Sequence, residues 1–135
     1  MQTVQEIMQG VVTNYQDING LMKAQFELAQ ISYQLAEEYS HSRKMSKIKS
    51  KALDEKENNE FLKYNMEKSL NTTTAKAMAK NTRDKDEEVE IIKLEATYKG
   101  NDVEIRQINK FLSALNQQVS NLKQERQQTN YNPQQ

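Results

Sequence analysis

The sequence predicts an all-α fold, with an elongated helical or coiled-coil protomer that assembles into a homo-oligomeric helical bundle or ring. Only three of the 135 residues are Gly and one is Pro, which is too few turn formers for a fold of many short strands. Hydrophobic residues make up 36% of the chain, below the roughly 45–50% of typical globular domains. The apolar residues are concentrated at heptad spacing, so we expect other subunits to complete the core.

Residues 1–20 are predicted to form an amphipathic helix. Its apolar residues follow steps of four and three, at Val4, Met8, Val11, Tyr15, Ile18 and Met22. We expect the Asn19-Gly20 pair to end this helix in a turn.

Residues 21–70 are predicted to form one long helix, with a basic segment at 43–56. Its first half carries one apolar stripe at Leu21, Ala24, Leu28, Ile31 and Leu35, and a second at Phe26, Ala29, Tyr33 and Ala36. A helix that is apolar on two sides needs more than one neighbour, so we expect oligomerisation to supplement the intrachain packing.

Residues 71–83 are predicted to be a loop or linker, because the run Asn71-Thr72-Thr73-Thr74 favours caps over helix interiors. A second break is expected near Asn81-Thr82. Residues 84–126 are predicted to form a helix whose acidic start suits the positive end of the helix dipole. The polar tail, residues 127–135, is expected to be disordered.

The C-terminal helix carries the clearest pattern in the chain, a stripe with alternating steps of three and four. We expect it to mediate oligomerisation through Ile91, Leu94, Tyr98, Asn101, Ile105, Ile108, Leu112, Leu115, Val119 and Leu122. Asn101 is its polar member. Either it fixes the register or oligomer state, or it is an irregularity beside Gly100.

The zero net charge is a sum of four blocks with net charges of −4, +6, −5 and +3, for residues 1–40, 41–83, 84–104 and 105–135. In the second block, basic residues crowd one helical segment and are candidates for binding nucleic-acid phosphates. These candidates are Arg43, Lys44, Lys47, Lys49 and Lys51. Tyr39, Phe61 and Tyr64 flank them and could stack on bases. Two alternatives stay open: a solvated helix face, or pairing with the acidic 84–104 block.

Composition excludes several classes of function. The chain has no Cys and a single His, so it offers no disulfide framework, thiol nucleophile or thiolate metal site. The acidic group Asp84, Asp86, Glu87 and Glu88 lacks the Gly and the spacing of a calcium loop. No apolar run approaches the roughly 18 residues of a membrane helix, and the N-terminus has no signal-peptide pattern. We expect a cytoplasmic non-enzyme with no catalytic residues, cofactor, metal or membrane partner.

The order of features resembles the UvsY-type recombination mediators of tailed phages. The matching pieces are Gln25-Phe26-Glu27 leading to His41-Ser42, a Lys-rich helix from Lys44 to Ala52, Asp84-Lys85-Asp86, and the run LSALNQQVSNLK at residues 112–123. The resemblance covers about residues 22–125.

The resemblance implies a ring-like homo-oligomer that binds single-stranded DNA. Such a protein displaces or remodels a single-strand binding protein and helps to load a RecA-type recombinase, in the host cytoplasm if the chain is phage-encoded. It also implies DNA contacts at Lys63 and Tyr64. The stretch from Glu60 to Asn65 departs from the family pattern, since it is less basic and lacks the family's Arg.

A different class of function is compatible with the same residues. The chain could be a non-enzymatic coiled-coil adaptor, or a phage structural or inhibitor protein, that acts through protein–protein contacts. In that case the basic block pairs with acidic helices, in the same chain or on a partner. Binding of single-stranded DNA at low salt would discriminate the two hypotheses.

Overall fold

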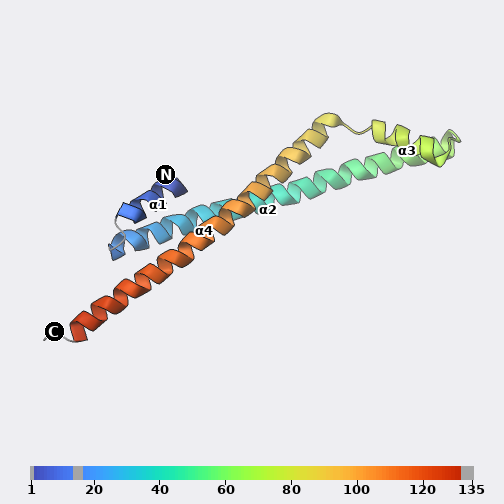
Figure 1. Cartoon of the computed structure of the whole chain (residues 1–135). Helices are drawn as coiled ribbons and strands as arrows, with labels where there is room; N and C mark the ends of the chain where they lie inside the picture. The colour runs from blue at the N-terminus through green and yellow to red at the C-terminus, as the bar shows by residue number, and fades with distance from the viewer. Residues whose placement is uncertain (1, 14–16, 132–135) are drawn as a thin grey trace. The chain divides into compact units, whose positions relative to one another are not determined.

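The computed structural model describes residues 2–13 and 17–131, and within these ranges the chain is all-helical (Figure 1). The prediction of an all-α fold is therefore confirmed. The elements are α1 (Val4–Thr13), α2 (Ile18–Leu62), a π-helical turn η1 (Lys63–Glu67), α3 (Thr72–Asn81) and α4 (Lys85–Tyr131). In the described ranges, no helix is both long enough and apolar enough to cross a membrane.

The chain divides into two compact units. Unit 1 contains the residues up to Glu37 and those from Asn101 onward, and unit 2 runs from Glu38 to Gly100. Both long helices contribute to both units, and each unit is described by itself.

Side-chain caps mark the starts of α1 and α2. Thr3 and Glu6 cap α1 reciprocally, with Thr3 Oγ1 accepting from the Glu6 amide at 3.2 Å and Glu6 Oε2 accepting from the Thr3 amide at 3.4 Å. Asp17 Oδ1 accepts from the Asn19 amide at 3.1 Å at the start of α2. Each of these side chains satisfies a backbone donor that the first turn of a helix leaves free.

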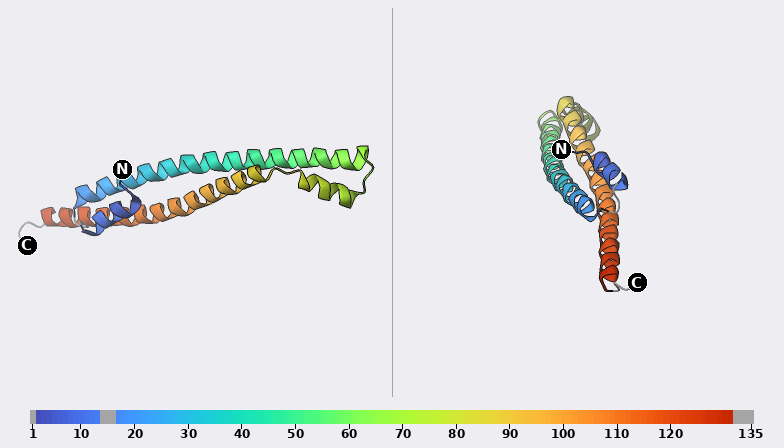
Figure 2. Two further views of the ribbon diagram at one scale, coloured as in Figure 1. Left: turned by 90° about the horizontal axis from the view of Figure 1, so that it is seen from above. Right: turned by 90° about the vertical axis from the view of Figure 1, so that its left-hand side faces the viewer.

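Unit 1 has a hydrophobic core made by α1, the first half of α2 and the second half of α4. Its buried members are Ile7, Ile18, Leu21, Ala24, Leu28, Ile108, Leu115 and Val119. Figure 2 shows α1 lying beside the early turns of α2. The first apolar stripe of α2 therefore meets residues of the α4 stripe within one chain.

Most of the buried side chains in unit 2 are small. On α2 the buried side chains are Ser42, Ser46 and Leu53, and α3 buries Ala75 and Ala79. Both Figure 1 and Figure 2 show α3 lying alongside the last turns of α2. Alanines at this spacing form one face of α3 and let it approach a neighbouring helix closely.

Two helix boundaries differ from the sequence predictions. Asn19 and Gly20 lie inside the first turn of α2, not in a turn after α1. A Cβ at Gly20 would lie 3.0 Å from Asp17 Oδ2, so glycine here leaves room for the capping carboxylate. α1 ends at Thr13 and α2 begins at Ile18, and Tyr15 lies outside the described residues.

The segment 71–83, expected as a linker, contains the helix α3. Asn71 Oδ1 accepts from the Thr74 amide at 2.8 Å, so Asn71 begins a helix where a loop was expected. The α-helical part of α2 ends before residue 70, where the helix was expected to end. It is followed by the π-helical turn η1 and then by Ser69, whose φ of 54° lies in the left-handed region. The long helix expected over residues 21–70 therefore ends as an α-helix at Leu62.

The C-terminal helix continues beyond residue 126. Residues 127–131, expected in a disordered tail, form the last turn of α4, and residues 132–135 lie outside the described part. Gln and Arg are good helix formers, so polarity alone did not end this helix.

Candidate nucleic-acid interface

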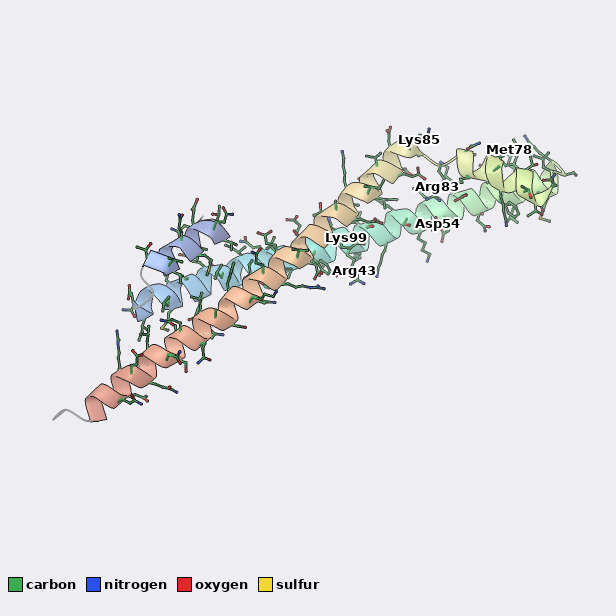
Figure 3. The ribbon with its side chains drawn as sticks, viewed as in Figure 1. Arg43, Asp54, Met78, Arg83, Lys85 and Lys99 are labelled. Carbon is green, nitrogen blue, oxygen red and sulfur yellow. The ribbon has the colours of Figure 1, made fainter. Side chains whose placement is uncertain are left out.

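Four cationic side chains share one exposed face of α2, which we call the basic face: Arg43, Lys44, Lys47 and Lys51. Residues 43, 47 and 51 are four apart, and Lys44 lies three before Lys47, so the four recur on the same side of the helix. Figure 3 shows Arg43 on this helix. The buried residues Ser42 and Ser46 lie on another side. The basic face extends for about 12 Å along the helix axis.

Lys44, Lys47 and Lys51 form no ion pair or hydrogen bond with any residue in the part of the chain that the structure describes. Arg43 is held differently. Its Nη1 atom donates to the Tyr39 hydroxyl at 3.1 Å, and its guanidinium carbon lies 5.9 Å from the centre of that ring. Arg43 has no carboxylate partner among the described residues, so no ion pair there neutralises its positive charge.

Lys49 is separated from this group. Its Nζ atom lies 3.1 Å from Glu90 Oε1 on α4. Lys49 lies on the side of α2 that turns toward α4, where its side chain is 32% exposed. One predicted phosphate contact is thus engaged with the acidic block, and the other four are not.

Tyr39 packs within the protein. Its ring meets that of Tyr98 edge to face, with centroids 5.8 Å apart and planes at 87°. Tyr98 was predicted to contact another subunit, and in this structure it contacts α2 of its own chain. A ring fixed on one edge by Tyr98 and covered by Arg43 offers little free surface to a base.

Lys63 and Tyr64 lie in η1, about 18 Å along the chain axis from Lys51. Lys63 is exposed and Tyr64 is half-buried. The Nζ atom of Lys68 lies 5.5 Å from the Tyr64 ring centroid. The structure therefore does not bring these two residues together with the basic face.

Phe61 is half-buried and lines an open groove of about 570 Å³ between the end of α2 and α3. Lys76 and Lys80 of α3 also line this groove, together with Asp54, Glu57 and Asn58. These two lysines were not predicted as neighbours of Phe61. Their i, i+4 spacing was visible, but the segment was assigned to a linker.

Arg83 lies in the short link between α3 and α4 and binds carboxylates of α2 and α4 within unit 2 (Figure 3). It donates from Nε to Glu88 Oε1 at 2.7 Å, and from Nη1 to Glu57 Oε2 at 2.7 Å and to Asp54 Oδ1 at 3.0 Å. Hydrogen bonds to Glu88, then Asp54 and Glu57, raise the pKa of Arg83 above its ordinary value. Arg83 is only 18% exposed, so we assign it to structure and not to the basic face.

The acidic start of α4 serves as a cap. Asp84 Oδ1 accepts from the amides of Asp86 at 2.9 Å and Glu87 at 3.3 Å, and Glu88 pairs with Arg83. Among the described residues, no group of three or more His, Asp or Glu side chains could hold a metal ion.

The predicted oligomerisation stripe of α4 is covered within the chain. Ile108, Leu115 and Val119 are buried in the core of unit 1, where Leu112 and Leu122 pack against them. In unit 2, Ile91 is buried and Leu94 is half-buried. The buried stripe residues of unit 1 therefore pack against helices of their own chain.

Asn101 is the buried polar member of the stripe. It is 7% exposed, and its Nδ2 atom has no hydrogen-bond partner among the described residues.

Neither a protein-family model, nor a curated protein sequence, nor a solved structure matches this chain.

Proposed function

We propose that this chain binds single-stranded nucleic acid through the basic face of α2. The observation that carries the proposal is the exposure of Lys44, Lys47 and Lys51 without any anionic partner in the described chain. Positive charges held together on a rigid helix attract phosphates, because binding releases the counterions that the phosphates had condensed.

The proposed biological role is that of a recombination accessory. Its resemblance to UvsY-type mediators supports a homo-oligomer that helps to load a RecA-type recombinase onto single-stranded DNA covered by a single-strand binding protein. Self-association matters for this role, because the four cations of one basic face bind single-stranded DNA only weakly. When several copies are joined in one oligomer, each further basic face meets the same DNA strand at a high effective concentration, so the affinity rises.

A fluorescence anisotropy titration with a labelled single-stranded oligonucleotide tests the proposal. Four phosphate contacts predict that log K falls with log salt with a slope of about −3. The triple variant Lys44→Ala/Lys47→Ala/Lys51→Ala should lose most of the affinity and most of the slope. Lys56→Ala is the matched control, because Lys56 is an exposed lysine on another side of the same helix.

The result that would overturn the proposal is an absence of binding at low salt, or binding that the triple variant leaves unchanged. The recombination role has a separate test. A RecA-type ATPase assay on DNA covered by single-strand binding protein should show stimulation by the chain and less stimulation by the triple variant.

A protein–protein adaptor is the second candidate function. The observation that favours it is the exposed apolar surface on α2, where Phe26 is 64% and Tyr33 is 66% exposed. An adaptor should bind a defined protein and ignore DNA, so the same anisotropy titration separates the two functions.

A further inference from the structure

We infer that two copies of this chain pair through the second apolar stripe of α2, antiparallel and about a two-fold axis. This inference rests on the self-association in the proposed function and is independent of nucleic-acid binding. The surface, which we call the α2 stripe, is that second stripe, Phe26, Ala29, Tyr33 and Ala36, extended by Met22 one heptad step earlier.

The α2 stripe is exposed in the folded unit 1. Met22, Phe26 and Tyr33 are 46%, 64% and 66% exposed, and both alanines are exposed. Leu21, Ala24 and Leu28 point into the core from the other side of the same helix. The steps of four, three, four and three between stripe residues are the heptad spacing of a helix-pairing seam, about 21 Å long.

Residue size favours an antiparallel partner. From Phe26 to Ala36 the stripe alternates large and small, with Phe26 and Tyr33 separated by Ala29. In an antiparallel pair, Phe26 faces Ala36 of the second copy and Tyr33 faces Ala29 of the second copy, so each of these layers combines a large side chain with a small one. A parallel pair would stack Phe26 on Phe26 and leave layers of two alanines.

Charge favours the same arrangement. Lys23 and Glu37 both flank the α2 stripe on one side, at equivalent heptad positions near its two ends. Antiparallel pairing places Lys23 of each copy beside Glu37 of the other, whereas parallel pairing places them beside Ile18 and Ser32 and forms no ion pair. Lys23 is free to turn, since its side chain is 78% exposed and its contact with Glu27 is 3.9 Å long.

The helix is already ordered by the core of unit 1, so pairing does not require it to fold first. The two-fold axis makes the same patch serve both copies.

Sedimentation velocity of the full chain without DNA, over a concentration series, tests the inference. We expect a reversible dimer whose Kd rises by about tenfold or more in Phe26→Glu. Tyr33→Glu should act in the same way, and circular dichroism should show that both variants keep their helix content. Val103→Glu is the control, because Val103 is 66% exposed in unit 1 but lies on α4.

Charge reversal tests the orientation. Lys23→Glu and Glu37→Lys should each weaken the dimer, and the double variant should restore it. The chain has no Cys, so an introduced cysteine is the only thiol in each variant and any disulfide must involve it. A mixture of Phe26→Cys and Ala36→Cys chains should form a mixed disulfide, whereas Met22→Cys alone should not cross-link.

Three results would contradict the inference, and each would remove a different part of it. A monomer at every concentration removes the second copy as the occupant and removes the proposed self-association. An oligomer that Phe26→Glu and Tyr33→Glu leave intact removes this interface but keeps self-association. Efficient cross-linking of Met22→Cys would show parallel pairing. DNA binding can persist in all three cases, because the basic face lies outside the α2 stripe.

Discussion

The Nζ atom of Lys49 lies 3.1 Å from Oε1 of Glu90, an ion pair that joins α2 to α4 within unit 2. Glu90 belongs to the acidic block that was the alternative partner for the basic segment. Of the five phosphate contacts predicted in the basic segment, Lys49 is therefore neutralised by Glu90. The other four cations, which form the basic face, are not paired with the acidic block.

This pair predicts a small effect of Lys49 on nucleic-acid binding. Lys49→Ala should change affinity for single-stranded DNA by less than any single substitution in the basic face, since its charge is already met by Glu90. Anisotropy titrations of Lys49→Ala and Lys47→Ala under the same salt give the comparison. Equal losses from the two variants would contradict the assignment.

Arg83 should stabilise unit 2. Arg83→Ala removes hydrogen bonds to Asp54, Glu57 and Glu88, and we expect the free energy of unfolding to fall by about 1–3 kcal/mol. Asp54 is 66% exposed, so solvent screens that contact and it adds little. Urea unfolding followed by circular dichroism measures the loss. Arg83→Lys should recover only part of it, because lysine lacks the planar guanidinium fork.

Asn101 should be a destabilising residue within the chain. A buried donor without a partner costs about 1–3 kcal/mol, and leucine has a similar size without the polar atoms. Asn101→Leu should therefore raise the midpoint of urea unfolding. A lower midpoint would contradict this assignment, because it would show that the Asn101 amide makes a stabilising contact in solution.

The core of unit 1 should depend on Leu28, which has no exposed surface. Leu28→Ala should lower the free energy of unfolding by about 2–5 kcal/mol, through lost burial and the cavity it leaves. Leu62→Ala is the control, since Leu62 is 44% exposed. Comparable losses in the two variants would contradict the core assignment.

Tyr33 should titrate above its ordinary pKa of 10.0, because the neighbouring Glu37 carboxylate accepts from the phenol and repels the phenolate. Glu37→Gln should lower the pKa of Tyr33 toward 10.0. A folded pKa above the unfolded value stabilises the fold below pH 10 and loses this effect as pH rises through the folded pKa. Carbon NMR of labelled tyrosines resolves the Tyr33 titration from the others.

Much of the helical layout followed from local pattern. Glycine scarcity and the apolar periods lie in the sequence, and they place the two long helices close to where the structure has them. The linker assignment of 71–83 was wrong because Ala75 and Ala79 are too small to stand out as an apolar stripe, although packing buries both.

The candidate interface was only partly predictable. The basic segment was visible in the sequence, and so was its helical periodicity. The pairing of Lys49 with Glu90, and the cover of Tyr39 by Tyr98, depend on which side of α2 meets α4. Residues 49 and 90 are 41 positions apart, and no local pattern encodes such a contact.

The sequence by itself determined that this protein is helical, that α2 is apolar on two sides and that its positive charge is gathered in one segment. These properties follow from residue type and helical period. Only the tertiary structure decided which stripe is used inside the chain: the α4 stripe meets Leu21 and Leu28, and Phe26 and Tyr33 stay exposed. The reason is that periodicity defines an apolar face, whereas the choice of its partner depends on packing between segments distant in sequence.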